Sequence, residues 1–225
     1  MKIARSGKEL LEICAAEQIS LSEYAIRQEM ELKNVSREDL FAQMKITLDA
    51  MKESATAGRE KKVYSLSGLI GGDAYRLQQY CNTGNSLMGN GIVMAMAMAI
   101  SSSEVNGAMA SGAVVELMGG TPKMSLDAAA IIFKNVLGLV CDPVAGLVEI
   151  PCAKRNVSGA INALCTADMV MAGVNSKIPF DDAVAAMYKV GTGLPEELRE
   201  TALGGCAITP TGKALQEKVF GKKEN

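Results

Sequence analysis

The sequence predicts an all-α protein, built as a single compact multi-helix domain with a short N-terminal helical appendage. Apolar residues recur at helical spacing in most segments, and helix start signals precede several of these segments. Strand-like alternation is nearly missing, because the apolar runs at 139–141 and 147–150 are too short to build a sheet. These three observations favour packed helices over any fold based on a sheet.

The N-terminal part is predicted to hold a helix over 8–17 and a longer one after residue 36. Ser36 and Asp39 have the spacing of a capping box, and the apolar residues that follow recur on one face. Gly58 predicts the end of this second helix. Glycines and small polar residues then crowd 65–91, around a short helix expected at 73–81. We therefore divide the chain into a helical appendage, 1–62, and a main all-α domain, 63–225.

The main domain is predicted to continue as a series of helices. Thr121 and Pro122 suit the N-cap and first position of a helix that stops at Gly138. Shorter helices are expected at 181–190 and 195–202, and Thr211-Gly212 suits the cap of a final helix. A helix over 154–172 is expected to bury one apolar face, which consists of Val157, Ile161, Leu164, Cys165, Met169 and Val170.

Composition excludes several classes of function. The 225 residues carry a formal net charge of −2, and aromatic residues make up 4% with no Trp, so neither a basic face nor a stacking platform for nucleic acid is expected. The longest uncharged apolar stretch, 92–100, is about half of what a membrane-spanning helix needs. No secretory signal is evident, and we expect a cytoplasmic protein with reduced thiols.

Histidine is absent from the sequence. A Ser-His-Asp triad, a Cys-His dyad and a histidine-based zinc site are therefore excluded within this chain. Any acid–base chemistry falls to carboxylates, Lys, Tyr or Cys, or to a partner chain. The glycine spacing at 84–91 resembles a phosphate loop but lacks the required Lys, and the sequence contains no C-x-x-C pair.

The segment 138–156 holds the strongest candidate site. Cys141 and Cys152 lie at the two ends of a predicted loop, in which Pro143 and Pro151 oppose regular helix. Cys152 would stand at a helix start, where the helix dipole lowers the pKa of a thiol, and Lys154 and Arg155 add positive charge. Two metal-ligating thiolates are one interpretation. Two buried cysteines in a packed loop are the other.

This segment resembles the cluster-binding signature of the iron–sulfur-dependent L-serine dehydratases, specifically their alpha chain. The resemblance continues through nearly the whole chain in order. It covers 10–51, Ser67 to Asp73, Glu104-Val105-Asn106, Pro179, Leu198-Arg199-Glu200-Thr201, Gly204-Gly205-Cys206-Ala207 and Thr209-Pro210-Thr211-Gly212.

The resemblance implies a lyase that removes water from L-serine and yields pyruvate and ammonia, in amino-acid catabolism and gluconeogenesis. It implies a 4Fe–4S cluster that three cysteines hold with one iron open, and no pyridoxal phosphate. It also implies a separate beta chain and a hetero- or homo-oligomer. Cys141 and Cys152 match two of the cluster ligands.

The sequence departs from the family after Met109, where it passes almost directly into Ser111-Gly112. Several dozen family residues are missing there, and the third cluster cysteine is among them. Asn85 also stands where a Lys is common. Two interpretations remain open: an active alpha chain, or a shortened non-catalytic paralogue that keeps the helical scaffold but cannot hold a complete cluster.

The remaining candidates each have a structural alternative. Cys206, in a glycine-rich loop, could supply the third sulfur, whereas Cys14, Cys81 and Cys165 are expected in the core. Asp142 could hydrogen-bond near the cluster or close an Asx-turn. Asn156 could touch substrate or bridge helices. Ser86 and the glycines around it could cradle a carboxylate or form a tight turn.

Overall fold

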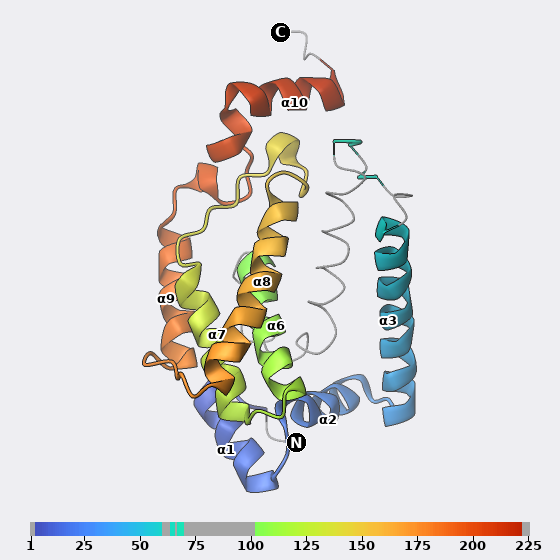
Figure 1. Ribbon diagram of the computed structural model, residues 1–225, viewed down its shortest axis with the longest axis vertical. Coiled ribbons are helices and arrows are strands. Elements are labelled where there is room, and N and C mark those ends of the chain that lie inside the picture. Colours follow the sequence, from blue (N-terminus) through green and yellow to red (C-terminus); the bar gives the residue numbers. More distant parts are fainter. Residues whose placement is uncertain (1–2, 60–63, 66, 70–101, 222–225) are drawn as a thin grey trace.

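The computed structural model describes residues 3–59, 64–65, 67–69 and 102–221 of the chain. It confirms the all-α prediction, since these residues form eight α-helices and no strand (Figure 1). The expected helix at 73–81, the phosphate-loop-like glycines, the apolar stretch at 92–100, Cys81, Asn85 and Ser86 lie outside the described residues. The helices are α1 (Gly7–Glu17), α2 (Leu21–Lys33), α3 (Arg37–Arg59), α6 (Ser102–Leu117), α7 (Pro122–Asn135), α8 (Cys152–Met171), α9 (Phe180–Gly193) and α10 (Pro210–Phe220).

Polar side chains at the helix starts explain where several helices begin. The hydroxyls of Ser6, Ser20, Thr121 and Thr209 each accept a hydrogen bond from the backbone N–H three residues on. The predicted capping box is confirmed, because Ser36 Oγ accepts from Asp39 N–H at 3.1 Å and Asp39 Oδ2 accepts from Ser36 N–H at 3.3 Å. The predicted cap at Thr121-Pro122 is confirmed as well.

Several predicted helix boundaries are wrong. The last helix is capped by Thr209 rather than Thr211, because the hydroxyl of Thr209 reaches Gly212 N–H at 3.0 Å. The α3 helix continues through Gly58 to Arg59, and α7 ends at Asn135, before Gly138. The segment predicted as a helix over 195–202 forms only a 3₁₀ turn, η2 (Glu196–Leu198).

The centre of the molecule is the contact of α6 with α7 and α8 (Figure 1). Small residues of α6 allow this close approach. A Cβ added to Gly107 would lie 3.6 Å from the carbonyl oxygen of Gly159 on α8, and one added to Gly112 would lie 3.4 Å from the carbonyl oxygen of Ser125 on α7.

The predicted apolar face of α8 is mostly wrong. Ile161 and Leu164 are 57% and 56% exposed, and Cys165 and Met169 are exposed too, whereas Val170 is buried as expected. The side chain of Val157 lies outside the described residues. The buried row of α8 consists mainly of the smaller residues Ala163, Thr166 and Ala167. Because small side chains bring helices closest together, this row faces the other helices and the larger apolar residues face away.

The two N-terminal helices pack into the same core as the later helices. Leu10 and Ile13 of α1 and Tyr24 of α2 share a buried cluster with Phe133 of α7 and Phe180 of α9, whose rings lie 5.9 Å apart. Asp181 at the start of α9 accepts hydrogen bonds from the backbone N–H groups of Gly7, at 2.6 Å, and Lys8, at 3.1 Å. The division at residue 62 stays a prediction.

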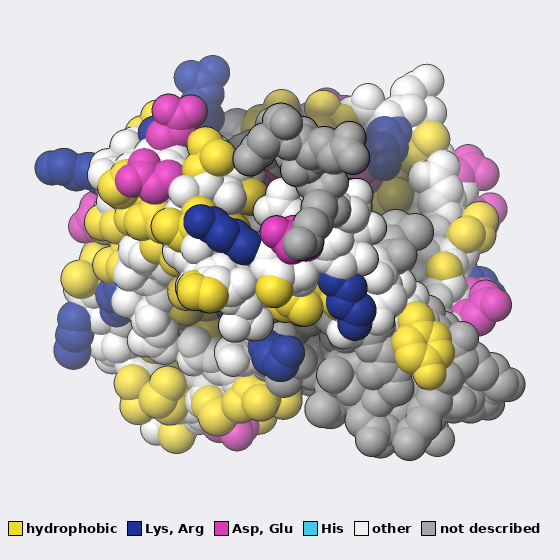
Figure 2. Space-filling model, turned by 90° about the horizontal axis from the view of Figure 1, so that it is seen from above, with side chains coloured by type: hydrophobic (Ala, Val, Ile, Leu, Met, Phe, Trp, Pro, Cys, Tyr) yellow, Lys and Arg dark blue, Asp and Glu magenta, His cyan; other side chains and the backbone are white. Residues whose placement is uncertain are grey.

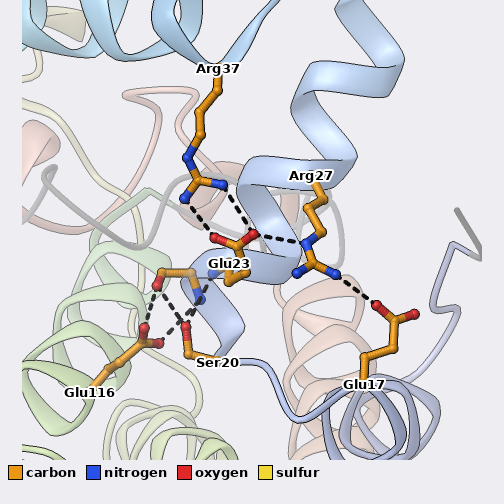
Figure 3. A network of polar contacts seen from close by, with 7 residues as sticks. Glu17, Ser20, Glu23, Arg27, Arg37 and Glu116 are labelled. Carbon is orange, nitrogen blue, oxygen red and sulfur yellow. Dashed lines mark hydrogen bonds and ion pairs between the residues drawn. The ribbon is translucent and has the colours of Figure 1, made fainter.

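A network of charged side chains joins α1, α2 and α3 (Figure 3). Glu23 pairs with Arg37 at 2.7 Å and with Arg27 at 2.8 Å, and Arg27 also reaches Glu17 at 3.0 Å. Beside it, the Glu116 carboxylate of α6 accepts hydrogen bonds from the backbone N–H and the hydroxyl of Ser22. The start of α2 is thereby attached to the central helix α6.

No helix in the described part of the chain has the length and apolar character to span a membrane.

Candidate functional site

The loop between α7 and α8 is irregular and proline-bounded, as predicted. It contains the 3₁₀ turn η1 (Val144–Gly146), in which Ala145 and Gly146 have φ of +60° and +71°. Val144 N–H donates to Ile150 O at 2.8 Å, which folds the loop back on itself, and the Ile150–Pro151 peptide is cis. Cys152 is the first residue of α8, so both cysteines occupy the ends of this loop as expected.

A second segment, far along the chain, lies beside Cys141. Cys141 N–H donates to Leu198 O at 2.9 Å, and Glu200 N–H donates to Cys141 O at 2.7 Å. These bonds form an isolated parallel bridge between Cys141 and Arg199. They bring the residues after α9 to the loop of Cys141, at the end of the molecule where α10 lies (Figure 1).

Asp142 is the centre of this region. Its carboxylate is buried and accepts hydrogen bonds from Arg155 Nη1 at 2.8 Å and from Cys206 N–H at 2.6 Å. Arg155 Nη1 also donates to Val140 O at 2.7 Å. Asp142 therefore joins the Cys141 loop, the first turns of α8 and the turn η3 (Gly205–Ile208).

The charge states follow from these contacts. Burial raises the pKa of the Asp142 carboxyl, but the hydrogen bonds from Cys206 and Arg155 outweigh burial and hold that pKa below its ordinary value. Burial raises the pKa of the Cys152 thiol more than Arg155 lowers it, so the expected lowering is wrong. A hydrogen bond to Asp142 raises the pKa of Cys206, and burial adds to this effect.

The structure brings most of the predicted site residues to one place. Cys141 and Asp142 are adjacent, Cys206 is hydrogen-bonded to Asp142, and the charges of Asp142 and Arg155 act on Cys152. Asn156, half-buried, follows Arg155 in α8. Ser86 lies outside the described residues. Cys14 is buried in α1, as expected, whereas Cys165 is exposed on α8, contrary to expectation.

The donor atoms fit an iron–sulfur cluster by chemistry but not by arrangement. Clusters are held by thiolates, and the segments that meet here carry three cysteines, Cys141, Cys152 and Cys206. Within the described residues, however, no group of three or more His, Cys, Asp or Glu could hold a metal ion. As they lie, these side chains do not form a cluster site.

Two features of this region were missed in the sequence. Arg155 was expected only as a nearby positive charge, but it is the ionic partner of Asp142. Glu149 of the loop accepts hydrogen bonds from the backbone N–H and the hydroxyl of Ser67, and so joins the loop to the described part of the glycine-rich stretch. The sequence shows only that Glu149 and Ser67 are polar residues in two separate motif segments, and this does not reveal that they are hydrogen-bonded.

The surface at this end carries charges of both signs. Figure 2 shows Lys and Arg side chains interspersed with Asp, Glu and hydrophobic ones. No broad surface of one sign is visible among the described residues in this view.

Comparison with known proteins finds similarity over most of the chain. The model of the family described as "Serine dehydratase alpha chain" matches residues 16–109 and 106–207. The "Probable L-serine dehydratase, alpha chain" of Bacillus subtilis is 39% identical over 287 aligned positions, which cover 96% of this chain and 95% of the relative. The "L-serine dehydratase, alpha chain" of Peptoniphilus asaccharolyticus is 32% identical, with coverage of 94% and 96%. A Latilactobacillus sakei protein, also named a probable L-serine dehydratase alpha chain, is 57% identical over 115 residues, or 51% of this chain and 55% of the relative.

The comparison also confirms an internal deletion. The 287 positions aligned with the Bacillus relative exceed the 225 residues of this chain by 62, so at least that many positions have no counterpart here. The two matches to the family meet at 106–109, the place where the sequence departs from its relatives. On either side of this deletion the similarity holds in order, and the chain therefore belongs to the serine dehydratase alpha chain family.

Proposed function

We propose that this chain is the alpha chain of an enzyme that eliminates water from L-serine to give pyruvate and ammonia. The similarity to two alpha chains named L-serine dehydratase, over more than nine-tenths of the chain, carries the proposal. The same names support a separate beta chain as partner, in a hetero-oligomer. The placement of both loop cysteines and of the Cys206 turn at one end of the fold agrees with a site there.

The proposed cofactor is a 4Fe–4S cluster, with Cys141, Cys152 and Cys206 as its ligands and without pyridoxal phosphate. A bound cluster with an open iron would supply a Lewis acid for the departing hydroxyl group. The three thiols do not form a metal site as they lie, so cluster binding requires their side chains to turn toward one another. The chain's own residues hold this framework: Asp142 and Arg155 join its segments, while Asn156 and Ser86 remain candidates for contact with the substrate.

The experiment is anaerobic purification of the chain together with a beta chain from a relative of the family. We expect bound iron and sulfide, pyruvate formed from L-serine, and no inhibition by hydroxylamine, which traps pyridoxal phosphate. The Cys141→Ser variant should lose iron and activity. Cys165→Ser is the matched control, because Cys165 is exposed on α8, away from the loop, and should retain both.

Two observations favour a second function, which we propose as the alternative. At least 62 family positions are absent, and the described side chains form no three-ligand metal group. A shortened non-catalytic paralogue would keep the helical scaffold and bind its partner without a cluster. A preparation that contains the beta chain but neither iron nor activity would support this second function and contradict the first.

A further inference from the structure

We propose that Asp142 is a positioning residue, which Arg155 orients and which fixes the turn Gly205–Ile208 so that Cys206 stays beside the Cys141–Cys152 loop. One part of this proposal rests on the proposed function: Cys206 would supply a third sulfur in place of the family cysteine that is lost with the deletion. The arrangement itself rests on geometry alone and is tested without any cofactor.

Both oxygens of Asp142 are already engaged by the protein. Oδ1 accepts from the Arg155 guanidinium at 2.8 Å, and Oδ2 accepts from Cys206 N–H at 2.6 Å. The Asp142 side chain is 2% exposed, so this buried charge is stabilised by a cation and by an N–H donor rather than by bulk water. A carboxylate used in this way orients its partners instead of contacting a substrate.

The backbone of the turn lies directly against this carboxylate. Gly205 has φ of +56°, and a Cβ at this position would lie 2.2 Å from Asp142 Oδ2. Behind the turn, a Cβ on Gly212 would lie 2.3 Å from Cys206 O. Only glycine permits both approaches, so the backbone of Cys206 is held between Asp142 and the first turn of α10.

Arg155 ties the carboxylate to the other side of the loop. One nitrogen, Nη1, donates both to Asp142 and to Val140 O. This nitrogen belongs to α8, three residues after Cys152. The residues flanking Cys141, the first turn after Cys152 and the turn of Cys206 thus share one hydrogen-bonded junction, although Asp142 and Cys206 are 64 positions apart.

The experiment measures amide hydrogen exchange at Cys206 in the chain without cofactor. Asp142→Asn and Arg155→Met should each speed exchange of the Cys206 N–H by about tenfold, as for loss of one hydrogen bond to a charged group. Arg155→Lys keeps the charge and should restore part of the protection. Asp181→Asn is the control, because its carboxylate binds Gly7 and Lys8 N–H elsewhere, and it should speed exchange only there.

A second measurement separates positioning from substrate contact. In an active alpha–beta preparation, Asp142→Asn should lower kcat and iron content while KM for L-serine changes little. Unchanged exchange at Cys206 in both Asp142→Asn and Arg155→Met would overturn the proposal, as would a raised KM with normal kcat. Faster exchange in a chain that never binds iron would support the positioning role and reject the proposed cofactor.

Discussion

At the scale of single residues, backbone strain is concentrated around Asp142. Among the described non-glycine residues with positive φ, Gln18 and Asn34 end helices α1 and α2. Ala145, Glu200 and Ala202 instead lie in the two segments that meet at the site. Such conformations cost about 1–3 kcal/mol each and persist where the surroundings enforce them. The site region is therefore held in shape at a cost to stability.

Replacing Ala145 with glycine should relieve one of these strains. At φ of +60° glycine carries no Cβ penalty, although its greater freedom in the unfolded chain offsets part of the gain. We expect Ala145→Gly to raise the free energy of unfolding by about 0.5 kcal/mol in urea denaturation. The control is Ala185→Gly in α9, an exposed helical position that should lose about 1 kcal/mol. A lower free energy of unfolding for both variants would show that Ala145 is not strained.

The Glu23 network predicts a dependence of stability on acid. Hydrogen bonds from Arg37 and then Arg27 lower the pKa of Glu23 to about 2, from an ordinary value of 4.5. Because the folded pKa is the lower one, the stabilisation is complete above pH 4.5 and is lost as pH falls towards 2. Between pH 4.5 and pH 2, the melting temperature of Glu23→Gln should fall less steeply than that of the parent chain, as measured by thermal unfolding. Parallel curves would contradict the pKa shift.

Two helix caps were predictable at this scale, although the cap of the last helix was placed at Thr211 instead of Thr209. Contacts between distant residues were not predictable. The caps at Ser36 and Thr121 were read correctly, because the donor and the acceptor lie three residues apart in the sequence. The link of Asp142 to Cys206 spans 64 positions. The pKa of Cys152 was predicted in the wrong direction, since burial, which the sequence does not report, outweighs the nearby Arg155.

At the scale of helices, small residues decide which faces meet. The periodicity of large apolar side chains placed Ile161 and Leu164 of α8 in the core, but both are more than half exposed. The buried contact uses Ala163 and Ala167, and on α6 it uses Ala108 and other small residues. Ranking residues by hydrophobicity cannot detect such an interface, because close backbone approach depends on small size.

Enlarging Gly107 should therefore separate α6 from its neighbours. Its Cβ position lies 3.3 Å from Ile132 Cγ2 of α7 and 3.6 Å from Gly159 O of α8. We expect Gly107→Leu to lower the free energy of unfolding by about 1–3 kcal/mol, the usual range for overpacking. Gly193→Ala, with no atom within 4 Å of its Cβ position, should be neutral or stabilising. Equal stability of both variants in urea denaturation would contradict close packing at Gly107.

At the scale of the whole molecule, composition separates the N-terminal helices from the later ones, whereas packing joins them in one core. The glycine-rich composition after Gly58 suggested a boundary near residue 62. Yet Leu10, Ile13 and Tyr24 pack with Phe133 and Phe180 in one buried cluster. The sequence could not show this, because the apolar face of a helix does not identify its partner.

This shared core predicts that α1 unfolds together with the later helices. Leu10 is 1% exposed, and truncating a fully buried leucine costs about 2–5 kcal/mol through lost burial and the cavity left behind. We expect Leu10→Ala to lower the free energy of unfolding by this amount in one transition, with far-UV and near-UV circular dichroism changing together. Lys8→Ala, at an exposed position of the same helix, is the control and should change stability little. Two separate transitions, with only the first shifted by Leu10→Ala, would instead show that 1–62 folds as an independent appendage.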